Sequence, residues 1–177
     1  MAHAFLLTGI RGVGKTTTAR IIAKALNCVS DGNKKEPTFE ICNECSPCKS
    51  INKGNFLDVI EVDAASRTGV DGIREIIDSV MYSPNNARYK VYIIDEVHML
   101  SNAAFNALLK TLEEPPQNVK FIFATTEIKK IPATIISRCQ KFDLQRVDIE
   151  TLTNHLNRIC KAENISYESN SIYQICK

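Results

Sequence analysis

The sequence predicts an α/β protein in which helices cover both faces of a parallel five-stranded sheet. Short apolar segments rich in β-branched and aromatic residues alternate with segments that repeat apolar residues at three- and four-residue spacing. Polar and glycine-rich loops separate the two kinds of segment. This alternation favours right-handed strand–helix–strand crossovers, which produce parallel strands.

Each element is predicted from its local pattern. Helices are expected at residues 16–26, 71–81 and 102–114, and Pro115 and Pro116 end the last of them because proline cannot continue a helix. Strands are expected at residues 4–8, 56–62, 90–94, 119–125 and 137–144.

The pattern changes after residue 146. Helices are expected at residues 148–162 and 170–177, with no further strand. The sequence therefore predicts an α/β domain over residues 1–146, interrupted by a polar, cysteine-containing insertion at residues 28–52, and the beginning of a helical domain over residues 147–177.

The composition restricts the class of protein. A chain of 177 residues with 44% apolar content buries one substantial core, and its net charge of +2 neither requires nor excludes a nucleic-acid partner. No segment has the roughly 20 apolar residues that span a membrane, and no signal-peptide layout is present, so we expect a cytoplasmic protein. The 7 cysteines then favour metal ligation over disulfides, because the cytoplasm keeps thiols reduced.

A phosphate-binding loop is predicted at residues 9–16. Their sequence, GIRGVGKT, fits GxxxxGK[ST] and lies between a predicted strand and a predicted helix. Such a loop directs backbone N–H groups at a phosphate chain, and the helix N-terminus adds partial positive charge. Lys15 is expected to reach the β- and γ-phosphates, and the Thr16 hydroxyl is suited to Mg²⁺. An ordinary glycine turn is the alternative, which the lysine and the flanking elements disfavour.

The residues expected to bind ATP are Gly9, Arg11, Gly12, Val13, Gly14, Lys15, Thr16 and Thr17.

Two carboxylates follow the apolar strand at residues 91–94, where ligands bind in open α/β sheets. We expect Asp95 to hold Mg²⁺ and Glu96 to polarise the attacking water. A solvated turn is the alternative for this pair. Thr126, at the end of the next apolar strand, is placed to sense the γ-phosphate, although threonine is also common at strand ends.

Four cysteines form a predicted metal site. Cys42, Cys45 and Cys48 follow CxxC spacing, and Cys28 at the end of the first helix supplies a fourth thiolate. Four thiolates suit tetrahedral Zn²⁺ in a closed, structural site. An iron–sulfur cluster is the alternative, and it usually requires a different cysteine pattern.

Taken together, these segments resemble a known family. The stretches GIRGVGKTTTAR, DAASRTGVDGIREI, VYIIDEVHMLSNAAFNALLKTLEEPP and FIFATTEIKKIPATIISRC, with the cysteine insertion, are similar to the gamma/tau subunits of bacterial DNA polymerase III. These are AAA+ ATPases of the clamp loader, which places the sliding clamp on primed DNA. The resemblance covers residues 2–146 and continues more loosely beyond them.

The resemblance implies roles for particular residues. Lys15 and Thr16 match the Walker A pair, Asp95 and Glu96 the Walker B pair, and Thr126 the sensor 1 position. Within Ser137-Arg138-Cys139, Arg138 matches the arginine finger, which in this family reaches the ATP of a neighbouring subunit. Taken alone, Arg138 is better interpreted as one partner of a surface salt bridge.

The resemblance also implies a contact with duplex DNA. Arg67, Arg74 and Lys110 match positions that in the family face the phosphate backbone. Contacts of this kind are independent of base sequence and sensitive to salt. Solvated surface charge is the alternative for each of them.

The chain departs from the family pattern at both ends and within the insertion. The helical segment that completes the adenine pocket would precede residue 2, and the lid domain has only begun by residue 177, so we expect this stretch alone to turn over ATP weakly or not at all. The linker from Cys28 to Cys42 is longer than the family pattern.

The predicted function is that of an ATP-hydrolysing motor subunit that acts with sister subunits, a sliding clamp and primed DNA in DNA replication. The resemblance places such a subunit in the DNA-directed DNA polymerase III holoenzyme, although nothing in this sequence resembles a nucleotidyl-transfer site. A P-loop phosphotransferase of the nucleotide-kinase type, with a zinc module, is the alternative. A non-catalytic subunit that binds nucleotide or zinc only as a brace is a third reading, which the intact Walker residues disfavour.

Overall fold

The computed structural model describes residues 2–29, 36–66 and 70–176. The chain divides into two compact units, Met1–Leu144 and Gln145–Lys177. Arg67, one of the predicted DNA contacts, lies outside the described residues.

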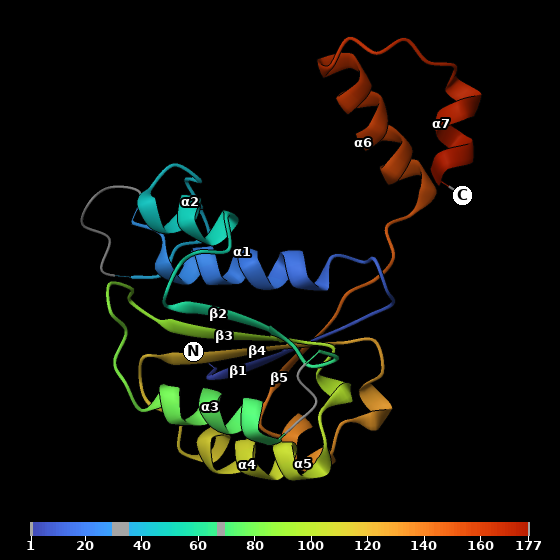
Figure 1. The fold of residues 1–177 in the computed structure, drawn as a ribbon. Helices are drawn as coiled ribbons and strands as arrows, with labels where there is room; N and C mark the ends of the chain where they lie inside the picture. Colours follow the sequence, from blue (N-terminus) through green and yellow to red (C-terminus); the bar gives the residue numbers. More distant parts are fainter. Residues whose placement is uncertain (1, 30–35, 67–69, 177) are drawn as a thin grey trace. The chain divides into compact units, whose positions relative to one another are not determined.

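The first unit is built on a single five-stranded sheet, as the sequence predicted (Figure 1). Its order is β2-β3-β4-β1-β5, and every neighbouring pair is parallel. The strands are β1 (Ala4–Thr8), β2 (Val59–Asp63), β3 (Lys90–Asp95), β4 (Val119–Thr125) and β5 (Gln140–Asp143).

Helices cover both faces of this sheet (Figure 1). On one face lie α1 (Lys15–Asn27) and α2 (Ser46–Asn52). On the other lie α3 (Val70–Val80), α4 (Asn102–Glu113) and the short α5 (Ala133–Ile136). This three-layer arrangement follows from the strands, which are buried on both sides: all residues of β1 and β4 are buried.

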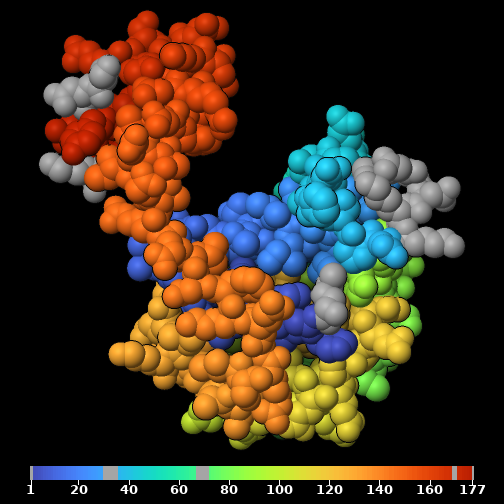
Figure 2. All heavy atoms as spheres, turned by 180° about the vertical axis from the view of Figure 1, so that it is seen from behind, coloured from blue at the N-terminus to red at the C-terminus, as the bar shows by residue number. Residues whose placement is uncertain are grey.

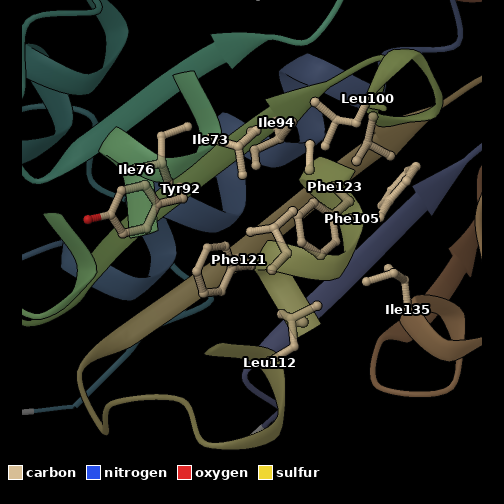
Figure 3. Packing of buried hydrophobic residues seen from close by; sticks show 14 of the residues in the cluster. Ile73, Ile76, Tyr92, Ile94, Leu100, Phe105, Leu112, Phe121, Phe123 and Ile135 are labelled. Atoms are coloured by element: carbon tan, nitrogen blue, oxygen red, sulfur yellow. The ribbon is translucent and has the colours of Figure 1, made fainter. Parts of the chain in front are cut away.

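The two-residue period of the strands divides the core into two clusters. On β3, Tyr92 and Ile94 pack toward α3 and α4, whereas Val91 and Ile93 pack toward α1. Figure 3 shows the larger cluster, which includes Phe121 from β4. The rings of Tyr92 and Phe121 stack with centroids 5.4 Å apart. The centre of the sheet is therefore a rigid base for the loops at the carboxyl ends of the strands.

Four short elements were not predicted. They are α2, α5 and two 3₁₀ helices, η1 (Val97–Met99) and η2 (Ile128–Lys130). Helices of three to seven residues contain too few turns to show a helical repeat in the sequence. The last strand, expected at residues 137–144, is restricted to Gln140–Asp143, and its residues are exposed at the edge of the sheet.

The second unit contains the two helices that the sequence predicted, α6 (Ile149–Ala162) and α7 (Ser169–Cys176). Asp148 caps α6, because its Oδ1 accepts a hydrogen bond of 2.8 Å from the backbone N–H of Thr151. Ile172 and Cys176 of α7 are buried. Among the described residues, no helix has the length and apolar character needed to cross a membrane.

Candidate functional site

The loop between β1 and α1 has a backbone that glycine permits. Gly9, Gly12 and Gly14 have φ values of 147°, 83° and 94°, in the region that other residues rarely adopt. Gly9 is further restricted by packing, since a Cβ there would lie 2.6 Å from the carbonyl oxygen of Leu144. Gly14 is the residue from which α1 begins. The loop is thus wrapped closely round the N-terminus of α1, as a phosphate site requires.

Lys15 lies across the loop. Its side-chain nitrogen donates hydrogen bonds of 3.0 Å to the carbonyl oxygens of Gly9 and Ile10, and the residue is only 6% exposed. The ammonium group is therefore held beside the backbone that would surround a phosphate chain.

Thr16 and Asp95 meet at the start of α1. The Thr16 hydroxyl donates a 2.5 Å hydrogen bond to Oδ2 of Asp95, although the residues are far apart in sequence. The other carboxylate oxygen of Asp95 accepts a 2.9 Å bond from the backbone N–H of Glu96. A hydroxyl and a carboxylate at this separation are the oxygen donors that Mg²⁺ prefers. The geometry fits the predicted magnesium ligands.

A pocket of about 350 Å³ opens at this point. It is lined by Arg11, Gly12, Gly14, Lys15, Thr16, Thr17, Asp95 and Glu96. Gly9 and Val13, which were also predicted to bind the nucleotide, do not line it directly. Gly9 contributes the carbonyl that accepts from Lys15, and the N–H of Val13 donates to the carbonyl of Ile10 at 3.4 Å. The structure thus brings together most of the predicted nucleotide ligands.

Glu96 contacts the end of the neighbouring strand. Its Oε2 accepts hydrogen bonds from the backbone N–H of Thr126 at 3.3 Å and from the Thr126 hydroxyl at 3.2 Å. The backbone of Glu96 adopts φ 46° and ψ 44°, a left-handed conformation that is uncommon for glutamate. This conformation turns the chain sharply after β3. The predicted pair of Glu96 and Thr126 is therefore in direct contact.

His98 is a site residue that the sequence analysis missed. Its side chain is only 6% exposed, with Nδ1 3.4 Å from Oε2 of Glu96 and Nε2 3.4 Å from Oε1 of Glu127. Nδ1 also lies 3.0 Å from the Thr125 hydroxyl. The available signal was a histidine two residues after the acidic pair, in a segment too short to show which way its side chain points.

Arg138 does not lie in the pocket of its own chain. Its Nη1 donates a 2.6 Å hydrogen bond to the carbonyl of Thr134, and its Nη2 lies 2.5 Å from Oε1 of Glu113 on α4. The side chain is about one-third exposed (33%). The structure therefore shows an exposed ion pair at this position and leaves the predicted role toward a neighbouring subunit untested.

The four predicted metal ligands form one cluster. The sulfurs of Cys28, Cys42, Cys45 and Cys48 all lie within 4.8 Å of one another, with 3.5 Å between those of Cys28 and Cys42. A zinc ion about 2.3 Å from each of four sulfurs would separate them by roughly 3.8 Å, so the cluster fits tetrahedral Zn²⁺. Hydrogen bonds from the backbone N–H groups of Cys45 and Glu44 lower the pKa of Cys42 to about 6, which favours its thiolate.

The cluster joins two helices on one face of the sheet. Cys28 follows the last residue of α1, and Cys45 and Cys48 lie at the start of α2. In the space-filling view, residues of this cysteine module stand out from the first unit beside α1 (Figure 2). Lys24 of α1 adds a further contact, donating a 2.9 Å hydrogen bond to the side-chain oxygen of Asn43.

The remaining predicted DNA contacts lie on the opposite face of the sheet. Arg74 on α3 and Lys110 on α4 are both exposed, and the two helices pack against each other. Their exposure alone does not distinguish a contact with DNA from solvated surface charge.

The chain is similar to known proteins along most of its length. A family model described as "DNA polymerase III, delta subunit" matches residues 1–148. The chain is 55% identical over 171 residues to DNA polymerase III subunit tau of Bacillus subtilis (strain 168), with 97% of this chain and 30% of the relative covered. It is 49% identical over 175 residues to the tau subunit of Escherichia coli (strain K12), with 99% and 26% covered.

A shorter relative gives the same result. DNA polymerase III subunit gamma of Buchnera aphidicola subsp. Acyrthosiphon pisum (strain APS) is 54% identical over 173 residues, which cover 98% of this chain and 46% of the relative. The chain therefore spans about a quarter to a half of the length of these relatives.

Solved structures share the fold. A DNA polymerase III gamma subunit-related protein from Thermotoga maritima superposes with a TM-score of 0.56 at 19% identity, covering 98% of this chain and 53% of that chain. The Holliday junction branch migration motor RuvB of the same species gives 0.66 at 20%, covering 100% and 49%. These likenesses confirm the predicted fold, a parallel five-stranded sheet flanked by helices. The family model covers the whole of the first unit, and about half of the residues are identical to those of tau and gamma subunits along almost the whole chain, so this chain belongs to the DNA polymerase III delta-subunit family.

Proposed function

We propose that this chain is the ATP-binding and ATP-hydrolysing part of a clamp-loader motor subunit that acts in bacterial DNA replication. The observation that carries the proposal is the contact between Thr16 and Asp95 in a pocket also lined by Lys15 and Glu96. These side chains come from two segments far apart in sequence. Together they provide a positive charge for the phosphates, two metal ligands and a general base. The relatives named as DNA polymerase III subunits support a role in DNA replication.

Each group has a distinct chemical role. On ATP binding, Lys15 exchanges the carbonyls of Gly9 and Ile10 for phosphate oxygens. Thr16 and Asp95 would hold Mg²⁺, which would supply positive charge beside the phosphates. Glu96 accepts a proton from water while the water oxygen bonds to the γ-phosphorus and the β–γ bridging bond breaks, giving ADP and phosphate. Arg138 of an adjacent subunit stabilises the charge of this transition state.

The proposed assembly includes sister subunits, a sliding clamp and the backbone of primed DNA, and its location is the cytoplasm. Residues 1–146 act as the ATPase domain, and residues 147–177 begin the lid domain. Arg67, Arg74 and Lys110 face the DNA phosphates. The cysteine module, within residues 28–52, binds a structural Zn²⁺ through Cys28, Cys42, Cys45 and Cys48, which is supported by the mutual distances of their sulfurs.

The decisive experiment measures ATP hydrolysis by the complete subunit assembled with its sister subunits, the clamp and primed DNA. Lys15→Ala is expected to lower the stimulated rate by about 100-fold or more, since it removes a fixed positive charge from the phosphates. Glu96→Gln is expected to abolish hydrolysis while ATP still binds. Replacement of an exposed lysine in the second unit, Lys161→Ala, is the matched control. A Lys15→Ala assembly with the unaltered stimulated rate would show the proposed function to be wrong.

A further inference from the structure

The side chain of His98 connects the carboxyl ends of two neighbouring strands. It projects from η1, directly after β3, and both of its ring nitrogens face oxygens on or beside the segment that ends β4. Nδ1 lies 3.0 Å from the Thr125 hydroxyl and 3.4 Å from Oε2 of Glu96. Nε2 lies 3.4 Å from Oε1 of Glu127. The ring therefore has a polar partner at each nitrogen.

The other partners of this histidine are themselves fixed. Thr125 is only 1% exposed, and its hydroxyl accepts a 3.0 Å hydrogen bond from the backbone N–H of Glu127. Glu127 accepts a 2.9 Å bond from Lys130, which lowers the pKa of this carboxyl and keeps it ionised. His98 is thus held on a turn whose backbone and side chains are already constrained.

Among the described residues, the contacts made by the carboxylate of Glu96 converge on one of its oxygens. Oε2 faces the Thr126 N–H, the Thr126 hydroxyl and Nδ1 of His98. Within residues 2–29, 36–66 and 70–176, no hydrogen bond is made to Oε1. A carboxylate accepts a proton from water through one of its two oxygens. The rate of this proton transfer depends on the orientation of the carboxylate, which contacts at the other oxygen fix.

From this asymmetry we propose that His98 is a positioning residue for ATP hydrolysis, which anchors Oε2 of Glu96 through Nδ1 so that Oε1 faces the attacking water. This inference rests on the proposed function of the same site and adds a residue to it. Among the described residues, His98 makes no hydrogen bond or ion pair with the predicted metal ligands or with the loop that surrounds the phosphates, although it lines a pocket with Asp95 and Arg11. Its removal should therefore slow the chemical step and leave nucleotide binding unchanged.

Two amide substitutions separate the two ring nitrogens. The side-chain amide of asparagine replaces Nδ1 of histidine, whereas that of glutamine replaces Nε2. His98→Asn retains a donor toward Glu96, and His98→Gln retains one toward Glu127. If the ring only held Glu127, His98→Gln would keep a higher kcat than His98→Asn. If the ring only filled space, the two variants would have the same kcat.

The test uses the complete subunit in the assembled loader, with kcat and KM for ATP hydrolysis measured together with binding of a fluorescent ATP analogue. His98→Ala is expected to lower kcat by about 10- to 100-fold, because misplacement of a base by a fraction of an ångström has effects of this size. KM and analogue binding should change less than about twofold. His98→Asn should restore most of kcat, and His98→Gln should behave as His98→Ala does. The exposed His155, replaced by alanine, is the matched control.

The outcomes are distinguishable from failure of the proposed function. If Lys15→Ala abolishes hydrolysis but His98→Ala leaves kcat unchanged, the motor assignment stands and the positioning role is wrong. If His98→Gln restores kcat as well as His98→Asn does, the contact with Glu96 is not the relevant one. A loss of analogue binding in His98→Ala that parallels its loss of kcat would likewise overturn the proposal, because it would indicate a general disturbance of the pocket.

Discussion

Arg138 and Glu113 form an ion pair that links the turn after α5 to the end of α4, with 2.5 Å between Nη2 and Oε1. The side chains are 33% and 50% exposed, so solvent screens their attraction. The guanidinium is therefore placed at the surface by a weak contact, which a stronger partner such as a phosphate group could replace.

This relationship predicts the behaviour of mixed assemblies. Arg138→Ala in one subunit should lower hydrolysis by the adjacent subunit by about 10³-fold or more, as the loss of an arginine finger does, while ATP binding there is retained. Glu113→Gln is the control: it should preserve hydrolysis and change the unfolding free energy by less than about 1 kcal/mol. Loss of ATP binding in the adjacent subunit would instead indicate a structural role for Arg138.

The contact between Thr126 and Glu96 predicts a graded effect on hydrolysis. Thr126→Val removes the hydroxyl at 3.2 Å but keeps the backbone N–H at 3.3 Å, so one of two protein hydrogen bonds from this residue remains. We expect kcat to fall by about 10-fold, the size of one hydrogen bond to a charged group. Thr126→Ser should restore the rate. Equal rates for the wild type and the valine variant would exclude this role.

Gly9 predicts an effect on stability that arises from packing. Gly9→Ala would place a methyl group 2.6 Å from the carbonyl oxygen of Leu144 at a φ of 147°, and should lower the unfolding free energy by about 3 kcal/mol. Gly54→Ala is the matched control, since Gly54 also has positive φ (69°) but has open space around it. It should cost about 1 kcal/mol. Chemical denaturation of the two variants measures the difference, and equal losses would contradict the packing argument.

Lys120 predicts a dependence of stability on alkaline pH. This lysine is only 3% exposed, and burial lowers its pKa below the ordinary value in the folded state. The unfolded chain then binds more protons than the folded chain at high pH, so the unfolding free energy rises as the pH increases from the lowered pKa to the ordinary value of about 10.4. The wild type should gain stability relative to Lys120→Met in this window. A constant difference between them would contradict the prediction.

The cysteine cluster predicts a loss of metal and of local structure together. Cys45→Ser should release bound zinc, measured per chain by atomic absorption, and should unfold α2, which begins directly after this residue. Treatment of the wild type with a strong chelator should have the same effect on circular dichroism. Cys160→Ser, in the second unit, is the matched control. Equal zinc contents in the Cys45→Ser and wild-type proteins would exclude ligation by these four thiolates.

The sheet and the phosphate loop were predictable because their signals are local. A buried parallel strand such as β4 is apolar along its whole length, and GIRGVGKT has a spacing that few other structures require. The meeting of Thr16 with Asp95 was also predictable, since the carboxyl ends of parallel strands share one edge of the sheet.

The contacts of His98 and Arg138 were not predictable in the same way. Each depends on the direction of one side chain in or just after a turn of three or four residues: His98 lies within η1, and Arg138 follows α5. Such turns are set by tertiary packing, which a linear pattern does not contain. The same reason explains why α2 was missed: its seven residues are held by contacts with α1 and by the cysteine cluster.

Helix α1 has chemistry at both of its ends. It begins at Lys15 beside the phosphate loop, and Cys28 follows its last residue, Asn27. That last residue is fastened to the entrance of β3 by paired hydrogen bonds of 3.0 Å and 2.9 Å with the backbone of Tyr89. Thirteen residues of helix form a rod about 20 Å long that does not bend easily. A tilt of α1 at the phosphate loop would therefore also move the cysteine cluster at the other end of the helix.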